Sequence, residues 1–180
     1  MFHTKNVYYF IDKFDRDEIL KLDKNVNIIF RNYNEKLDEK IIIKIRNTCK
    51  TSKRKFYIAN NLKYALKLNL DGVYIPAFNK ELSPKYLNQK KFELLGSAHN
   101  KQEIFIKEKQ GVNIIFISPV FRVKKKKYFL DTIKFNLLTK LTKKKVIALG
   151  GINKNNINKI KLLNCSGFAS ISYLKDKVKN

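Results

Sequence analysis

The sequence KKVIALGGINKNNINKI, residues 144–160, combines the features that decide the fold. A short apolar run, 146–150, has the aliphatic composition of a buried strand. Gly150 and Gly151 end it, and they are two of only six glycines in the chain. The apolar residues of 157–163 then recur at helical spacing. A strand that ends in a glycine turn and leads into a helix is typical of parallel α/β folds.

Seven further apolar runs have the same character. They are short and rich in Val, Ile, Phe and Tyr, as buried strands are, and they cover residues 7–11, 26–30, 56–59, 72–75, 92–96, 112–117 and 167–171. The polar segments between them carry apolar residues at helical spacing, most clearly over 37–45, 62–70 and 129–141. Strands that alternate with helices predict βαβ units and a parallel sheet.

Eight such units predict an α/β fold of the (β/α)8 TIM-barrel type. The barrel is compact, and its last helix is expected to be stunted because only YLKDKVKN, residues 173–180, follows the eighth run and Ser172. With 180 residues, the whole range 1–180 is expected to form a single domain. The alternative is a doubly wound open sheet, which the number of strands and the lack of a Gly-rich loop after the first strand disfavour.

The chain is strongly basic, with a formal net charge of +24. Lysine is spread over every predicted helix and is abundant together with Asn and Ile, which is typical of a coding bias, so no specific nucleic-acid partner is expected. A field of this sign does attract phosphorylated metabolites. Because no apolar run reaches about 18 residues, no membrane partner is expected. Two distant cysteines and the lack of a signal-peptide pattern favour a reduced, cytoplasmic setting.

In a barrel of this type, function is carried by the loops that follow the carboxyl ends of the strands. The polar residues and glycines at these positions are Arg31, Asn60, Asn79, Ser97, His99, Arg122, the lysines of 124–127, Gly150, Gly151 and Ser172. Asp12 is the main carboxylate at these ends, which leaves few of the oxygen ligands that Mg²⁺ prefers.

Three of these features allow both a functional and a structural interpretation. Gly150 and Gly151 suit a phosphate site, since free backbone N–H groups between the last two loops can meet an anion, or they form a plain tight turn. Arg122 and the lysines beside it either clamp phosphates or form a solvated basic loop. His99 either shuttles protons near neutral pH or is an ordinary polar loop residue. Because no Asp or Glu follows His99 closely, a hydrolase triad is not expected.

Five segments, in order, resemble the thiamine-phosphate synthase/TenI family, a group of (β/α)8 barrels. They are LKYALKLNLDGVYIP (62–76), LLGSAHN (94–100), IIFISPVFRVKKKK (114–127), VIALGGINKNNI (146–157) and GFASISYL (167–174). The resemblance covers nearly the whole chain, from about Val7 to Leu174. It implies thiamine biosynthesis. The family's synthase joins a hydroxymethylpyrimidine diphosphate to a thiazole phosphate with Mg²⁺ and releases pyrophosphate, and its TenI branch includes a thiazole tautomerase that uses a histidine.

The resemblance also implies roles for individual residues. The candidate residues for binding substrate or phosphate are Arg31, Ser97, Arg122, Gly150, Gly151 and Ser172, and the candidate catalytic residues are His99 and Lys126. The glycine pair and Ser172 match the thiazole-phosphate side of the family's site. On the pyrimidine side, Tyr33 replaces a lysine, and Asn60 and Asn79 replace two metal-binding aspartates. Mg²⁺ is therefore a cofactor that the resemblance implies and that the two asparagines argue against.

The function expected first is that of a thiamine-phosphate-synthase-like transferase acting on small phosphorylated thiazole and pyrimidine ligands. Because the metal-binding carboxylates are missing, two alternatives stay open. One is a TenI-like tautomerase in which His99 moves the proton. The other is a non-catalytic barrel that binds thiazole phosphate or thiamine phosphate. The sequence leaves the oligomeric state open.

Overall fold

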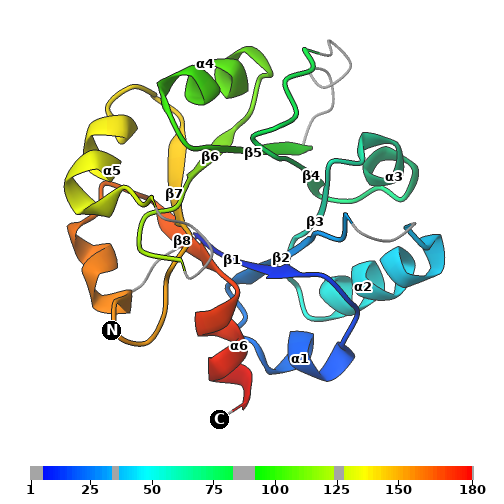
Figure 1. Ribbon diagram of the computed structural model, residues 1–180. Helices are drawn as coiled ribbons and strands as arrows, with labels where there is room; N and C mark the ends of the chain where they lie inside the picture. Colours follow the sequence, from blue (N-terminus) through cyan, green and yellow to red (C-terminus); the bar gives the residue numbers. More distant parts are fainter. Residues whose placement is uncertain (1–5, 34–36, 83–91, 124–127, 180) are drawn as a thin grey trace.

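The centre of the computed structural model, which describes residues 6–33, 37–82, 92–123 and 128–179, is a closed barrel of eight parallel strands. Each strand is hydrogen-bonded to the next in the sequence, and β8 closes the ring against β1 (Figure 1). The strands are β1 Asn6–Ile11, β2 Val26–Phe30, β3 Phe56–Ala59, β4 Gly72–Ile75, β5 Glu93–Ala98, β6 Ile114–Ile117, β7 Lys145–Leu149 and β8 Gly167–Ser170. The predicted (β/α)8 barrel is confirmed, and the alternative of an open doubly wound sheet is wrong.

Helices surround the barrel (Figure 1). They are α1 Arg16–Lys21, α2 Glu39–Thr51, α3 Leu62–Lys67, α4 Lys101–Lys109, α5 Asp131–Thr139, the 3-10 helix η2 Ile157–Leu162 and α6 Ser172–Lys179. The last of these has eight residues, whereas α1, α3 and η2 have six each. Among the described helices, none combines the length and the apolar composition that crossing a bilayer requires.

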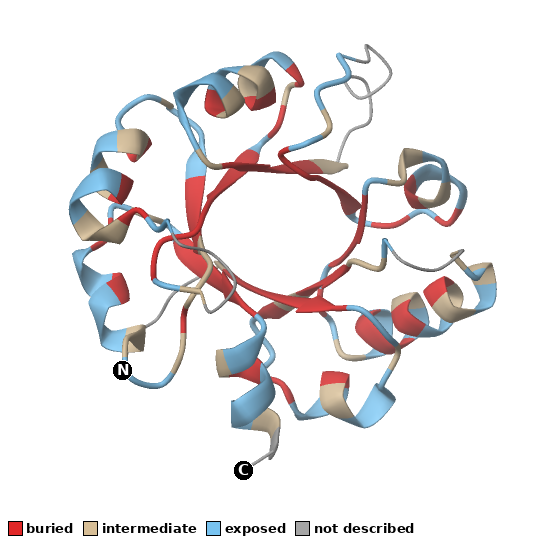
Figure 2. Ribbon diagram, viewed as in Figure 1, coloured by how far each residue is buried: buried red, intermediate tan, exposed pale blue. Residues whose placement is uncertain are grey.

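The strands are buried on both faces, which explains why their sequences are continuous apolar runs rather than alternating ones. Every residue of β3 and β4 is buried, and the ring of strands stands out as the buried part of the molecule (Figure 2). Side chains on one face fill the barrel, and those on the other pack against the helices. The predicted ranges 26–30, 56–59 and 72–75 coincide with β2, β3 and β4.

Aromatic side chains fill the inside of the barrel. Tyr8 and Phe10 of β1 meet Phe116 of β6 and Tyr74 of β4, with ring centroids 5.0 Å apart for Tyr8–Phe116 and 5.1 Å for Phe10–Tyr74. Both pairs are edge-to-face, the arrangement that the ring quadrupoles favour. Large rings allow a compact barrel to be packed solidly, so any ligand must bind above this core rather than within it.

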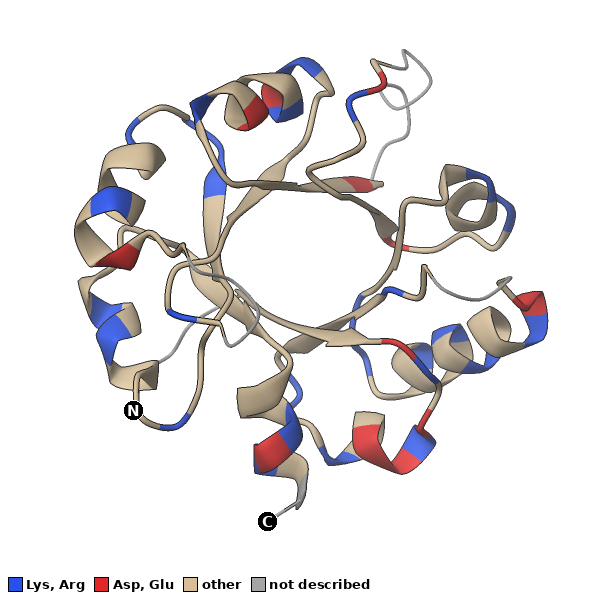
Figure 3. Ribbon diagram, viewed as in Figure 1, with Lys and Arg blue, Asp and Glu red and all other residues tan. Residues whose placement is uncertain are grey.

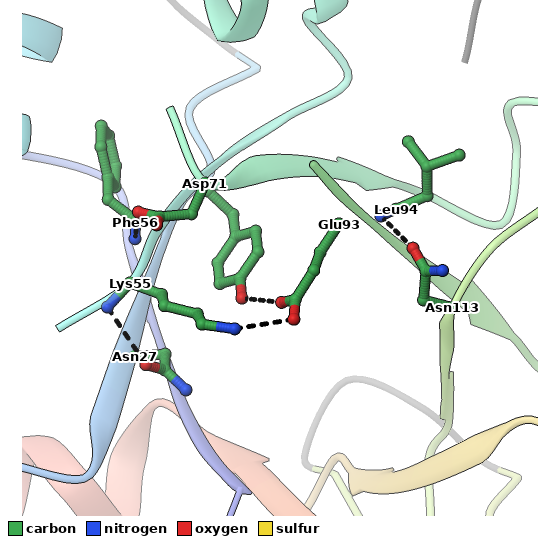
Figure 4. A network of polar contacts seen from close by, with 8 residues as sticks. Asn27, Lys55, Phe56, Asp71, Glu93, Leu94 and Asn113 are labelled. Carbon is green, nitrogen blue, oxygen red and sulfur yellow. Dashed lines mark hydrogen bonds and ion pairs between the residues drawn. The ribbon is translucent and has the colours of Figure 1, made fainter. Parts of the chain in front are cut away.

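A polar network lies at the amino ends of the strands (Figure 4). Glu93, the first residue of β5, accepts a hydrogen bond from the Tyr57 hydroxyl and pairs with Lys55 Nζ at 2.7 Å. Burial, the nearby Tyr8 hydroxyl and the bond to Glu93 raise the pKa of Tyr57 far above its ordinary value. Asn113 supports the same strand by accepting from the Leu94 backbone N at 2.7 Å. These contacts stabilise the end of the barrel opposite to the candidate site.

Many of the lysines and arginines lie on the helices around the barrel (Figure 3). The apolar residues at helical spacing within 129–141 do not form the buried face of α5, because Ile133 is 72% and Leu137 56% exposed. The helix instead buries Phe135 and Thr139, which lie on nearly the opposite side of the helix, since two residues turn an α-helix by about 200°. A helix with apolar residues on two faces can bury only one of them, and here the larger aromatic side chain is buried.

Candidate active site at the carboxyl ends of the strands

Gly150 and Gly151 form a turn that only glycine fits. Both have left-handed backbone conformations, with φ of +94° and +74°. A Cβ on Gly150 would lie 2.9 Å from Pro119, and a Cβ on Gly151 would lie 2.4 Å from the carbonyl oxygen of Phe121. The loop after β6 therefore packs directly on the glycine pair, and Phe121 N donates to Gly150 O at 3.1 Å. The tight-turn interpretation has a physical basis here, and the phosphate role stays a prediction.

The glycine turn lies beside the backbone of Arg122. A Cβ on Gly151 would be 2.7 Å from the Arg122 carbonyl oxygen, and the Arg122 side chain is exposed. Two predicted phosphate-binding elements from different loops are thus neighbours. Lys126, the other basic candidate of this loop, lies outside the described residues.

Ser172 is the first residue of α6 and is exposed. Ser170, at the end of β8, is buried instead, and the sequence did not point to it. Its hydroxyl donates to Ile152 O at 3.2 Å and accepts from Tyr173 N at 3.1 Å. Ser170 therefore ties the loop after β7 to the start of α6 and sets the position of the Ser172 backbone beside it.

Arg31 follows β2 and lies over the core of the barrel, with its guanidinium carbon 4.8 Å from the Phe10 ring centroid. A cavity of about 90 Å³ opens beside it, at the carboxyl end of β1. The cavity is lined by Tyr9, Phe10, Ile11, Asp12, Lys13, Glu18, Arg31, Ile171 and Lys175. Arg31 and the amino-terminal turn of α6 therefore face one concavity.

Ser97 lies within the same end of the barrel but is buried. Its hydroxyl is hydrogen-bonded to Tyr74. Burial raises the pKa of Tyr74, while the hydrogen bond to Ser97 and the charge of Arg31 oppose that rise. Arg31, Tyr74 and Ser97 thus form one group on the inner face. The predicted contact of Ser97 with a phosphate stays a prediction.

His99 follows β5, and a carboxylate holds it, contrary to the sequence-based expectation. Glu103 Oε2 lies 2.8 Å from His99 Nδ1 and accepts from the His99 backbone N at 2.7 Å. Asn100 caps α4 by accepting from Glu103 N at 2.9 Å. The signal was present in the sequence, since Asn100 and Glu103 have the spacing of a capping box, whose glutamate reaches back before the helix.

The loops after β3 and β4 meet through Asn60 and Asn79. Asn79 Nδ2 donates to Asn60 Oδ1 at 2.7 Å, and Asn60 has the left-handed φ of +53° that asparagine tolerates. The loops after β2 and β4 also meet, through the rings of Tyr33 and Phe78, which lie edge-to-face at 5.6 Å. The sequence placed both asparagines at strand ends, and the structure brings their amides into direct contact.

The site residues therefore share one end of a barrel, and comparison with known proteins shows which group of barrels this is. A family model described as thiamine monophosphate synthase matches residues 19–174. The chain belongs to the thiamine monophosphate synthase family. The resemblance stated from the sequence is thereby confirmed.

This member of the thiamine monophosphate synthase family has relatives named thiamine-phosphate synthase. The chain is 34% identical to the one from Prochlorococcus marinus (strain MED4) over 150 residues, which are 81% of the chain and 42% of that protein. It is 30% identical to the one from Campylobacter jejuni (strain RM1221) over 142 residues, 76% of the chain and 65% of that protein. The chain spans less than half the length of the Prochlorococcus relative.

Solved structures share the fold of this thiamine monophosphate synthase family member. The thiamine phosphate pyrophosphorylase from Pyrococcus furiosus superposes with a TM-score of 0.73 at 18% identity, over 98% of this chain and 93% of that one. The corresponding protein from Bacteroides thetaiotaomicron gives a TM-score of 0.62 at 17% identity, over 97% and 95% of the two chains. At these identities the likeness supports the barrel fold.

Proposed function

We propose that this chain is a transferase that couples a hydroxymethylpyrimidine diphosphate to a thiazole phosphate. The observation that supports the proposal is that the candidate anion-binding residues follow the carboxyl ends of strands of one barrel, in a chain of the thiamine monophosphate synthase family. Arg31 stands on one side of that end, and the Gly150–Gly151 turn with Arg122 stands on the other. Two anionic substrates can therefore be held face to face above the aromatic core.

In this proposal, Arg31 and Arg122 bind the substrates and offset the charge of the leaving group. Coupling forms one bond between the two fragments and breaks the carbon–oxygen bond to the diphosphate, which leaves with the electron pair. Arg31 and Arg122 are permanently charged and can pair with phosphate oxygens in bidentate geometry. The net charge of +24 raises the local concentration of both substrates.

The direct test is product formation. The purified chain is incubated with both substrates, and thiamine phosphate and released pyrophosphate are quantified. We expect equal amounts of both products, and we expect Arg31→Ala to lower the rate at least tenfold. Lys140→Ala, a change at an exposed residue beyond α5, is the matched control and should leave the rate unchanged. Absence of product where a known synthase turns over would contradict the proposal.

A second candidate function is favoured by the His99–Glu103 contact. A histidine whose Nδ1 is held by a carboxylate presents Nε2 for proton transfer, which is what a thiazole tautomerase requires. Isomerisation of the thiazole carboxylate phosphate, followed by NMR, tests it with wild type and His99→Ala. An unchanged isomerisation rate in the variant would exclude this role for His99.

A further inference from the structure

The amide pair of Asn60 and Asn79 has a defined hydrogen-bond direction. The Glu81 backbone N–H meets the Asn79 side chain at 3.0 Å, and because an N–H can only donate, the atom that it meets is Oδ1. The other terminal atom of Asn79 is therefore Nδ2, a donor. It must face an acceptor, so the atom of Asn60 that lies 2.7 Å away is Oδ1. The two loops are therefore joined by a direct hydrogen bond between two side-chain amides.

A buried cage from α4 fixes the loop that carries Asn79. Lys107 is completely buried, and its Nζ donates to Pro76 O at 2.9 Å, to Asn79 O at 2.7 Å and to Gln110 Oε1 at 2.8 Å. Gln110 in turn donates from Nε2 to Asn79 O at 3.0 Å and to Glu81 O at 2.9 Å. All three protons of the ammonium are used, so the cage is satisfied and holds the loop in one conformation.

These residues do not fit a magnesium ion. Mg²⁺ needs near-octahedral oxygen ligands and is bound through carboxylates, whereas this pair offers two neutral amides. The contact point between the loops holds an N–H group, which repels a cation. Within the described ranges, no cluster of three or more His, Cys, Asp or Glu side chains that could hold a metal is found elsewhere.

We propose that the Asn60–Asn79 bond, held in place by Lys107 and Gln110, replaces a metal bridge between the loops after β3 and β4, so that this site binds its ligands without a divalent cation. The part that concerns ligands rests on the proposed function. The part that concerns the metal does not, because it follows from the donor groups alone. The hydrogen bond between the Asn60 and Asn79 side chains and the cage around the Lys107 ammonium together fix the relative position of the two loops, which a shared ion would otherwise do.

The first experiment measures metal binding by the full chain without ligand. Free Mn²⁺ is followed by electron paramagnetic resonance for wild type and for the double variant Asn60→Asp/Asn79→Asp. We expect no binding by wild type at millimolar Mn²⁺. We expect at least tenfold tighter binding by the double variant, because two adjacent carboxylates repel each other until a cation joins them. Mn²⁺ should also raise the melting temperature of the double variant alone.

Asn61→Asp is the matched control for added charge. Asn61 caps α3 by accepting from Tyr64 N at 3.0 Å, and aspartate caps equally well, so the control gains a carboxylate next to the site while its fold is kept. Asn61→Asp should bind no more Mn²⁺ than wild type does. Binding of Mn²⁺ by wild type as tight as by the double variant would overturn the proposal. So would a folded double variant that binds no Mn²⁺.

The second experiment separates this inference from the proposed function. The melting temperature of wild type is measured with inorganic pyrophosphate and with thiazole phosphate, each in EDTA and in Mg²⁺. We expect equal stabilisation in both buffers. Stabilisation that appears only with Mg²⁺ would overturn the inference. If neither ligand stabilises the chain in either buffer, the proposed function fails, while the Mn²⁺ titration still decides the metal question.

Discussion

Glu103 Oε2 lies 2.8 Å from His99 Nδ1 and also accepts the His99 backbone N–H at 2.7 Å. One helix therefore serves both halves of the candidate site. The first turn of α4 fixes His99 through Glu103, and its end fixes the loop after β4 through Lys107 and Gln110. A single rigid element thus sets the distance between His99, the candidate proton-transfer residue, and the Asn60–Asn79 pair, as a preorganised site requires.

The tautomer of His99 should depend on Glu103. An ionised carboxylate can only accept, so Nδ1 must carry the proton and Nε2 is left as the acceptor. We expect the nitrogen chemical shifts of the neutral His99 ring to report the Nδ1–H form. In Glu103→Ala the Nε2–H form, which is intrinsically favoured, should predominate.

Glu108→Ala is the control for this experiment, since Glu108 lies on the same helix and bonds Thr142 Oγ1 at 2.6 Å instead of His99. It should keep the Nδ1–H tautomer. An identical tautomer in wild type and Glu103→Ala would show that the carboxylate does not set the orientation of His99.

Replacing Lys107 by Met should destabilise the chain and loosen the loop after β4. Pro76 O keeps Asn79 N as a donor and Asn79 O keeps Gln110 Nε2, so Gln110 Oε1 is the buried acceptor that loses its partner. One such group costs about 1–3 kcal/mol of unfolding free energy. Urea unfolding gives this loss, and faster hydrogen exchange at Asn79 and Glu81 reports the loop. Lys109→Met, at an exposed residue of α4, should change stability by less than about 0.5 kcal/mol.

The effect of Lys107→Met should also depend on pH. Burial lowers the pKa of Lys107 to about 8, against the opposing charge of Glu103. The folded chain therefore holds this proton less tightly than the unfolded chain, whose lysine pKa is about 10.4. The stability contributed by a depressed pKa is present above the unfolded value and is lost as pH falls through the folded value. The difference in the free energy of unfolding between wild type and Lys107→Met should widen from about pH 8 to about pH 10.4. A difference that stays constant over this range would contradict the lowered pKa.

Substitution of the glycine pair should affect folding before it affects binding. Gly151→Ala should cost about 1–3 kcal/mol for its left-handed φ alone, with more for a Cβ that would lie 2.4 Å from the Phe121 carbonyl oxygen. Gly150→Ala, whose Cβ would meet Pro119 at 2.9 Å, should cost less. Urea unfolding of both variants gives the ranking. Equal stability of Gly151→Ala and wild type would show that the loop after β6 does not rest on this turn.

The sequence predicted the parts of the molecule that depend on local pattern. The strands were found because consecutive residues, such as Ile28 and Ile29, are both apolar and face opposite sides of a sheet that is buried on both faces, and this pattern needs no knowledge of neighbours. The contact between Asn60 and Asn79 was out of reach, because it depends on how two separate loops are held by α4. The sequence also could not show that α5 buries Phe135 and exposes Ile133, because packing decides which of two apolar faces is buried.

Cys49 offers a probe of unfolding with its own pH signature. The thiol is 1% exposed on α2, and burial raises its pKa to about 12, an effect that the charge of Arg54 opposes and that of Asp71 reinforces. A raised pKa stabilises the folded chain below the unfolded value, about 8.5, and that stability is lost as pH rises through the folded value.

In a Cys165→Ser background, alkylation of Cys49 by iodoacetamide at pH 8 should occur only through unfolded molecules and should accelerate with urea in step with the unfolding curve. As pH rises above about 8.5, the free energy of unfolding should fall more steeply for Cys165→Ser than for Cys49→Ala/Cys165→Ser. Rapid alkylation in the absence of urea would mean that α2 opens locally and that Cys49 is not held in the core.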